Sequence, residues 1–152
     1  MIGRRQFAVT GLTAAALAAL GSNAFAQGGK RGGGPHHKES FDKCSEACSR
    51  CQRECDSCAA HCIEQVADGN KHHMETVQTC RDCADICSVA AQITARGGVF
   101  ADLICQTCAD ACARCAKACE QHGRDDKVMQ KCAEECRRCE RECREMLAGL
   151  HK

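Results

Sequence analysis

Cysteine recurs in this chain at alternating intervals of three and four residues, which is the repeat of one face of an α-helix. Between residues 40 and 68 the successive intervals are 4, 3, 4, 3 and 4. Residues 27–152 contain 18 Cys but only 17 large apolar side chains, and the chain has no Trp or Tyr. Because a core cannot be filled without the thiols, the cysteines must lie inside a helical fold.

Four segments carry this repeat, and glycine follows each of them. The segments span about residues 40–68, 71–96, 99–122 and 126–148, and the glycines are Gly69, Gly97-Gly98, Gly123 and Gly149. Glycine is favoured at helix C-termini because it can adopt positive φ. Asn70 can cap the N-terminus of the second expected helix, and Asp125 or Asp126 can cap that of the fourth. Since the connections are short, the pattern predicts an all-α, antiparallel up-down-up-down four-helix bundle with a Cys-lined core over residues 40–150.

The first 26 residues have the organisation of an export signal. Paired arginines, Arg4 and Arg5, precede a short apolar stretch, and Ala24-Phe25-Ala26 fits a cleavage site. The stretch is shorter than the ~20 residues that span a bilayer. The arginine pair resembles the twin-arginine type of signal, whose known role is the export of folded proteins. We expect a signal peptide over residues 1–26, a flexible Gly/His linker over residues 27–39, and a periplasmic mature chain without a membrane anchor.

The charge balance excludes a nucleic-acid-binding protein. The chain has 21 Lys and Arg, two of which are Arg4 and Arg5, so 19 remain beyond the signal against 20 Asp and Glu. Nucleic-acid binding needs a basic excess, together with stacking aromatics for single strands. The sequence therefore predicts no nucleic-acid partner.

Two cysteines four residues apart on one helix cannot form a disulfide without straining it. Their Cβ atoms lie about 5–6 Å apart, whereas a disulfide needs about 3.5–4.5 Å. Two such thiolates can still hold one soft metal ion between them. Eight pairs have this spacing, and C-x-x-C steps link pair to pair, so the bundle should be lined with sulfur. The predicted metal ligands are Cys44, Cys48, Cys51, Cys55, Cys58, Cys62, Cys80, Cys83, Cys87, Cys105, Cys108, Cys112, Cys115, Cys119, Cys132, Cys136, Cys139 and Cys143.

Spacing and charge favour Cu(I) among the soft metals. Zinc prefers closed groups of four ligands, and iron–sulfur binding typically uses runs ending in Cys-Pro, but no Pro follows a cysteine here. Cu(I) accepts two or three bridging thiolates, and each ion that displaces one proton leaves the core neutral. We expect a store of up to about 18 Cu(I) ions. A zinc or general thiolate sink, an iron–sulfur electron-transfer protein and a disulfide-linked bundle remain alternatives.

Three stretches closely resemble the four-helix-bundle copper storage proteins: Cys58-Ala-Ala-His-Cys62, the Cys105–Cys119 run and the Cys132–Cys143 run. The twin-arginine start is similar to the exported branch of that family. The resemblance implies a bundle that holds many Cu(I) ions on its core cysteines, either as a reserve for copper enzymes or as protection from copper. Copper-dependent enzymes, chaperones or chelators are the implied partners. It also implies that His61 matches a histidine at the open end of the family's bundle.

An antiparallel bundle brings different residue types to its two ends. One end, here called the His end, should gather His61, His73, His122 and Met129, which are candidate copper ligands because imidazole and thioether bind copper. The other, here called the apolar end, should be closed by Phe41, Ile93, Phe100, Leu103, Met146, Leu147 and Leu150. No isolated nucleophile, carboxylate pair or phosphate-binding loop stands out from the repeat, so we do not expect an enzyme.

Overall fold

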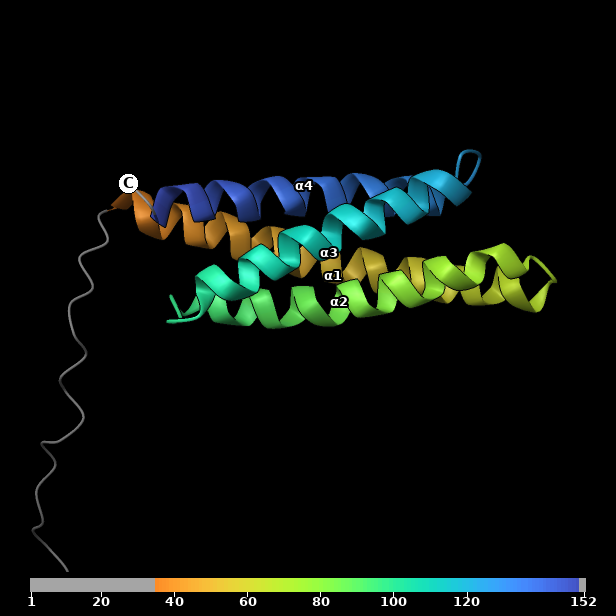
Figure 1. The fold of residues 1–152 in the computed structure, drawn as a ribbon, viewed down its shortest axis with the longest axis horizontal. Helices are drawn as coiled ribbons and strands as arrows, with labels where there is room; N and C mark the ends of the chain where they lie inside the picture. Colours follow the sequence, from red (N-terminus) through yellow and green to blue (C-terminus); the bar gives the residue numbers. More distant parts are fainter. Residues whose placement is uncertain (1–34, 151–152) are drawn as a thin grey trace, which may run out of the picture. The chain divides into compact units, whose positions relative to one another are not determined.

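The computed structural model describes residues 35–150, and the expected signal peptide and residues 27–34 of the expected linker lie outside this range. Within residues 35–150 the chain forms four α-helices and one 3₁₀ turn (Figure 1). The elements are α1 (Pro35–Ala67), η1 (Lys71–His73), α2 (Met74–Ala95), α3 (Ala101–His122) and α4 (Lys127–Leu150). Each α-helix contains one of the four cysteine segments, which confirms the helical reading of the repeat.

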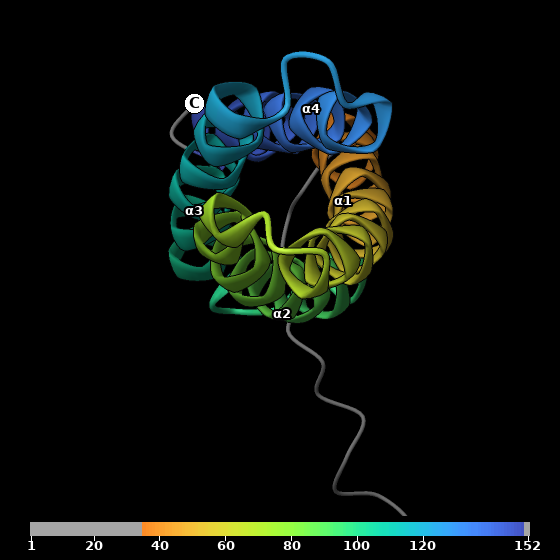
Figure 2. The same cartoon turned by 90° about the vertical axis from the view of Figure 1, so that its right-hand side faces the viewer.

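The helices form the predicted antiparallel bundle. Seen along the helix axes, α1, α2, α3 and α4 follow one another around a common centre, so each packs against two neighbours (Figure 2). The turns between α1 and α2 and between α3 and α4 lie at one end, and the turn between α2 and α3 lies at the other (Figure 1). Within residues 35–150 no helix is long and apolar enough to cross a membrane.

Several helix boundaries differ from the expected ones. Helix α1 begins at Pro35, so residues 35–39 are helical and not linker, because proline's fixed φ and missing N–H suit the first helical position. Gly149 lies inside α4 and does not end it. Asn70 does not cap a helix, since its side chain donates a hydrogen bond to Gln65 instead. The cap at Asp126 is confirmed, because its carboxylate accepts hydrogen bonds from the N–H groups of Val128 and Met129.

Thiols and small alanines make up most of the core. All 18 cysteines are at most 1% exposed, and buried alanines such as Ala84, Ala109 and Ala133 stand beside them on the inner faces. Small side chains let the helix backbones approach closely, so sulfur atoms of different helices can touch. Met129 and Met146, at opposite ends of α4, are the largest fully buried side chains among the described residues.

The apolar end differs in part from its prediction. Met146 is buried, and Phe41, Ile93, Leu147 and Leu150 pack against the core as expected. Phe100 and Leu103, however, are 62% and 64% exposed. The inner face of α3 runs through Ala101, Cys105 and Cys108, so positions 100 and 103 fall on its outer side. That part of the prediction was wrong, and these two side chains do not close the bundle.

Candidate metal centre

Sulfur atoms from different helices touch along the length of the core. Cys44 of α1 lies 3.6 Å from Cys105 of α3 and 3.5 Å from Cys143 of α4, measured between Sγ atoms. Further along, the Cys80 Sγ of α2 lies 3.5 Å from that of Cys115. The helices run antiparallel, so each step along α1 meets a new set of thiols. The single-helix repeats thereby merge into one continuous column of sulfur.

Cysteines four residues apart on one helix are close without being bonded. The Sγ atoms of Cys51 and Cys55 are 3.9 Å apart, and those of Cys83 and Cys87 are 4.0 Å apart. A disulfide would require about 2.05 Å, and all 18 cysteines are free thiols in this structure. A soft ion bound at about 2.3 Å to each sulfur bridges such a gap. The geometry therefore suits metal binding within each C-x-x-x-C pair.

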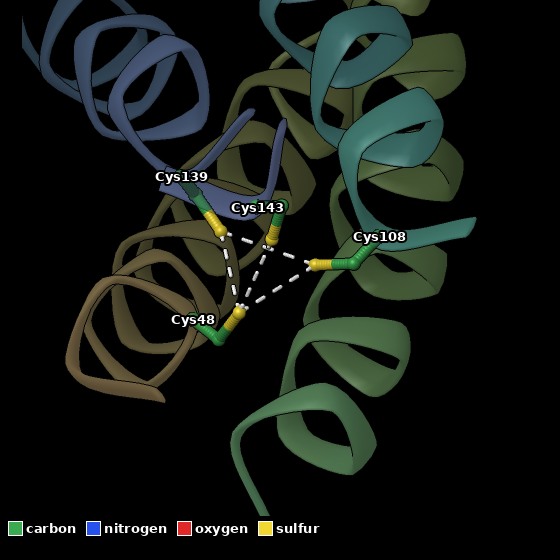
Figure 3. Close-up of side chains that lie close together, drawn as sticks. All are labelled: Cys48, Cys108, Cys139 and Cys143. Atoms are coloured by element: carbon green, nitrogen blue, oxygen red, sulfur yellow. Dashed lines mark hydrogen bonds between the residues drawn. The ribbon is translucent and has the colours of Figure 1, made fainter. Parts of the chain in front are cut away.

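Contacts across helices also create closed groups of four thiols. Cys48 of α1, Cys108 of α3, and Cys139 and Cys143 of α4 point toward a common centre (Figure 3). The Cys48 Sγ lies 3.8, 3.6 and 3.6 Å from the sulfurs of Cys108, Cys139 and Cys143. Further groups whose sulfurs all lie within 4.8 Å of one another are Cys51/Cys83/Cys87/Cys112, Cys51/Cys55/Cys83/Cys136, Cys55/Cys115/Cys132/Cys136 and Cys58/Cys80/Cys119/Cys132. The helical repeat predicted pairs of cysteines on single helices, whereas these groups of four arise from the packing of the helices against one another.

Neighbouring thiols shift one another's pKa values in opposite directions. The hydrogen bond from Cys119 lowers the pKa of the Cys58 thiol to about 5. The contact with Cys58, together with burial, raises the pKa of the Cys62 thiol. A sulfur that accepts S–H hydrogen bonds is stabilised as the thiolate, while its donors keep their protons. The core can thus form its first thiolates without ionising every cysteine.

The His end contains the predicted imidazoles, partly paired with carboxylates. His61 of α1 lies 2.6 Å from the Asp126 carboxylate, measured from Nε2 to Oδ2. The His122 Nε2 lies 3.6 Å from a carboxylate oxygen of Glu75. Burial raises the pKa of Asp126, but its hydrogen bonds with His61 and with the N–H groups of Met129 and Val128 outweigh this and lower it overall. These pairs connect α1 to the start of α4, and α3 to α2.

Two buried polar atoms at the His end have no hydrogen-bond partner among the described residues. They are the Nδ1 atom of His73 and the hydroxyl oxygen of Thr76. His73 is 6% exposed and Thr76 is fully buried, and burial, with the neighbouring charge of His72, lowers the pKa of His73. An unpaired buried polar group is costly, so both atoms are available to a ligand or water. Thr76 was not predicted as a site residue, although it lies on the cysteine face of α2.

The other candidate ligands lie at the same end but differ in access. Met129 is completely buried, and its side chain packs against Gly123, where an added Cβ would come within 2.4 Å of the Met129 Cβ. His61 and His122 keep 25% and 26% of their side-chain surface exposed. The rings of His72 and His122 have centroids 6.0 Å apart. The end of the sulfur column is thus bordered by half-buried imidazoles that reach solvent.

Comparison with known proteins places this arrangement among copper-binding bundles. Residues 37–148 match the family described as copper storage protein. The fold is similar to that of a cytosolic copper storage protein from Streptomyces lividans solved with five coppers, with a TM-score of 0.68, 35% identity, and coverage of 76% of this chain and 98% of that one. It is also similar to Cu(I)-bound BsCsp3, with a TM-score of 0.63, 33% identity, and coverage of 73% and 98%. An uncharacterised cysteine-rich protein of Bacillus subtilis, YhjQ, is 35% identical over 87 residues, which are 56% of this chain and 81% of that protein.

Proposed function

Because this chain belongs to the copper storage protein family, we propose that its sulfur-lined core stores many Cu(I) ions. The observation that carries the proposal is the continuous column of 18 buried, unbonded thiols. Each Cu(I) that replaces one thiol proton leaves the total charge of the core unchanged, so dense loading adds no net buried charge. Storage in this form supplies copper enzymes or protects the cell from free copper.

All 18 cysteines act as ligands in this proposal. Pairs such as Cys51 and Cys55 hold an ion from within one helix, and contacts such as Cys44 to Cys105 extend the binding across helices. If each ion takes two sulfurs and each sulfur bridges two ions, the capacity approaches one ion per cysteine, about 18. The role is sequestration and requires no catalytic step.

The His end is the proposed site of copper uptake and release. His61 and His122 are partly exposed at this end of the sulfur column, whereas His73 and Met129 are buried there. The Nδ1 of His73 has no hydrogen-bond partner among the described residues and is free to bind. Imidazole and thioether ligands bind copper more reversibly than a thiolate cluster, which suits transient contact. Copper chaperones, chelators or copper-dependent enzymes would exchange the metal there.

The test is a titration of the reduced, metal-free mature protein with Cu(I) under anaerobic conditions, against a coloured Cu(I) chelator. We expect the protein to withhold many ions from the chelator, approaching one per cysteine. Saturation at four ions or fewer would contradict the proposal. Thiol counting under denaturing conditions provides the control, because storage requires nearly all 18 thiols to be free after the metal is removed.

We also propose that the protein is exported to the periplasm after folding. The support is the Arg4-Arg5 signal, together with the family match, which begins at residue 37, beyond the proposed leader. Folding and loading before export would protect the thiols, since an unfolded chain with 18 thiols would form mixed disulfides in an oxidising compartment. Replacing both arginines, Arg4→Lys with Arg5→Lys, should abolish accumulation of mature protein outside the cytoplasm. An unchanged amount of exported protein would contradict export by this route.

A further inference from the structure

The four-sulfur group in Figure 3 has the spacing of a tetrahedral metal site before any metal binds. Four sulfurs bound at about 2.3 Å to one ion stand about 3.8 Å apart at the corners of a tetrahedron. The measured distances from the Cys48 Sγ to the three other sulfurs are 3.8, 3.6 and 3.6 Å, and that from Cys108 to Cys139 is 3.9 Å. The two remaining pairs lie within 4.8 Å, so an ion at the centre would require only limited movement of the side chains.

Closed groups of this kind recur, but they share cysteines. Cys51 and Cys83 each belong to two groups, and so do Cys55, Cys132 and Cys136. At most three of these five groups can be chosen without sharing a cysteine, for example Cys48/Cys108/Cys139/Cys143, Cys51/Cys83/Cys87/Cys112 and Cys58/Cys80/Cys119/Cys132. The core can therefore hold three ions in these closed sites at once, and 18 cysteines set an upper limit of four such sites.

Neighbouring thiols can stabilise the charge of such a site. A divalent ion with four thiolates carries two negative charges, which are costly in a buried core without hydrogen bonds. Cys44, which belongs to none of the three groups above, lies 3.5 Å from Cys143 and is placed to donate a hydrogen bond to the group in Figure 3. Hydrogen bonds from such outer groups tune metal–thiolate sites. Successive ions should bind more weakly, because the charged sites repel one another.

We propose that the metal-free core is also a binding site for divalent d¹⁰ ions, Zn(II) or Cd(II), held in three or four closed four-sulfur sites per chain. Each ion replaces four thiol protons, which leave for solvent, and no oxidation or reduction occurs. Cu(I) storage releases one proton per ion at full loading, so the two cargoes differ in stoichiometry and in proton release. Both occupy the same sulfur column and therefore compete.

Cadmium is the probe for the test. The reduced, metal-free protein is titrated with Cd(II) under anaerobic conditions, following the ultraviolet cadmium–thiolate absorption and the protons released, with ¹¹³Cd NMR to identify the ligands. We expect three or four ions per chain, about four protons per ion, and resonances typical of four-thiolate sites. A failure to compete with a weak chelator, more than four ions, or about two protons per ion would each overturn the proposal.

A parallel Cu(I) titration separates this proposal from copper storage. Dense Cu(I) loading without tight Cd(II) binding would overturn only the divalent sites, whereas weak binding of both ions would overturn both proposals. The variant Cys48→Ser removes one ligand of the group in Figure 3. It should lower the Cd(II) number by one, which is a quarter to a third of the total, but reduce Cu(I) capacity by only about one ion in 18.

The matched control is Ser49→Ala, on the same helix but off the sulfur face, which should change neither number. Circular dichroism establishes that both variants fold. An unchanged Cd(II) number in folded Cys48→Ser would overturn the assignment of that group.

Discussion

The two ends of the bundle differ in how their buried polar groups are satisfied. Thr76 and Thr94 stand on the same helix, on either side of its three cysteines, and both are buried. The Thr94 hydroxyl donates to the carbonyl groups of Ala90 and Ala91, at 2.8 and 3.2 Å. The Thr76 hydroxyl and the nearby His73 Nδ1 have no partner within the described residues. At the apolar end, the buried hydroxyl is therefore hydrogen-bonded. At the His end, buried polar atoms remain available to a ligand.

This difference shows how one core can be both closed and accessible. At the apolar end, Met146 is buried and Phe41, Ile93, Leu147 and Leu150 pack against the core, which excludes water from the last thiols. At the His end, the imidazoles paired with Asp126 and Glu75 are partly exposed to solvent. Apolar packing stabilises the fold, whereas unsatisfied polar atoms cost stability and favour ligand binding. The stability of the fold should therefore depend mainly on the apolar end, and copper uptake mainly on the His end.

The largest effect on stability should come from Met146→Ala at the apolar end. Removing this buried side chain should lower the free energy of unfolding by about 2–5 kcal/mol, since it leaves a cavity. Cu(I) uptake by the protein that remains folded should keep its rate. Urea unfolding of the reduced, metal-free protein measures the first effect. Phe100→Ala, which removes an exposed side chain, is the control and should change stability by less than about 0.5 kcal/mol.

The largest effect on uptake should come from His73→Ala at the His end. Losing this imidazole should slow the transfer of Cu(I) from a coloured complex on the order of tenfold, as loss of a group near a metal site commonly does. The final capacity should not change, because the thiols remain. The matched control is Thr94→Ala, on the same helix beyond the last cysteine. Equal rates in the two variants would remove the functional distinction between the ends.

A smaller effect should follow from Asp126→Asn. Asparagine caps a helix about as well as aspartate does, so this change isolates the contact with His61. Above the ordinary Asp pKa of 3.8, the variant should be less stable by about 1–2 kcal/mol. The pKa of Asp126 is lowered in the fold, so its contribution is present above 3.8 and is lost as pH falls through the lower folded value.

Unfolding measured between pH 7 and pH 2 checks this prediction. The difference between the two proteins should shrink as Asp126 becomes protonated. A constant difference across the whole range would show that the charge of Asp126 is not the cause.

The smallest effects, of opposite sign, should come from two isosteric changes. Thr76→Val removes a buried hydroxyl that has no hydrogen-bond partner in residues 35–150, and it should stabilise the metal-free protein by about 0.5–1 kcal/mol. Thr94→Val removes a satisfied hydroxyl and should destabilise it by a similar amount. Thermal unfolding of both variants under the same reducing conditions gives the comparison. Destabilisation by Thr76→Val would indicate that its hydroxyl is bonded in solution and that the two ends are alike.

The pattern of cysteines was sufficient to predict the helices and their inner faces. Intervals of three and four residues place Cys105, Cys108 and Cys112 on one side of α3, and all 18 cysteines are buried. The same pattern was insufficient to predict which side chains are buried at the helix ends. Phe100 and Leu103 were expected in the core because they are apolar, but they lie off the inner face of α3. Thr76 was not predicted as a site residue, because a threonine on the cysteine face of a helix does not indicate a metal ligand. Asp126 was predicted only as a helix cap.

The sequence by itself determined that this chain forms four antiparallel helices around a sulfur-rich core, because helical periodicity and short connections are local properties. Only the tertiary structure decided which thiols meet across helices. The contact of Cys48 with Cys139, 91 positions apart, depends on how the helices rotate and shift against one another. That packing is set by side chains far apart in the sequence. It turns pairs of cysteines on single helices into closed groups of four, and it leaves one end of the column polar.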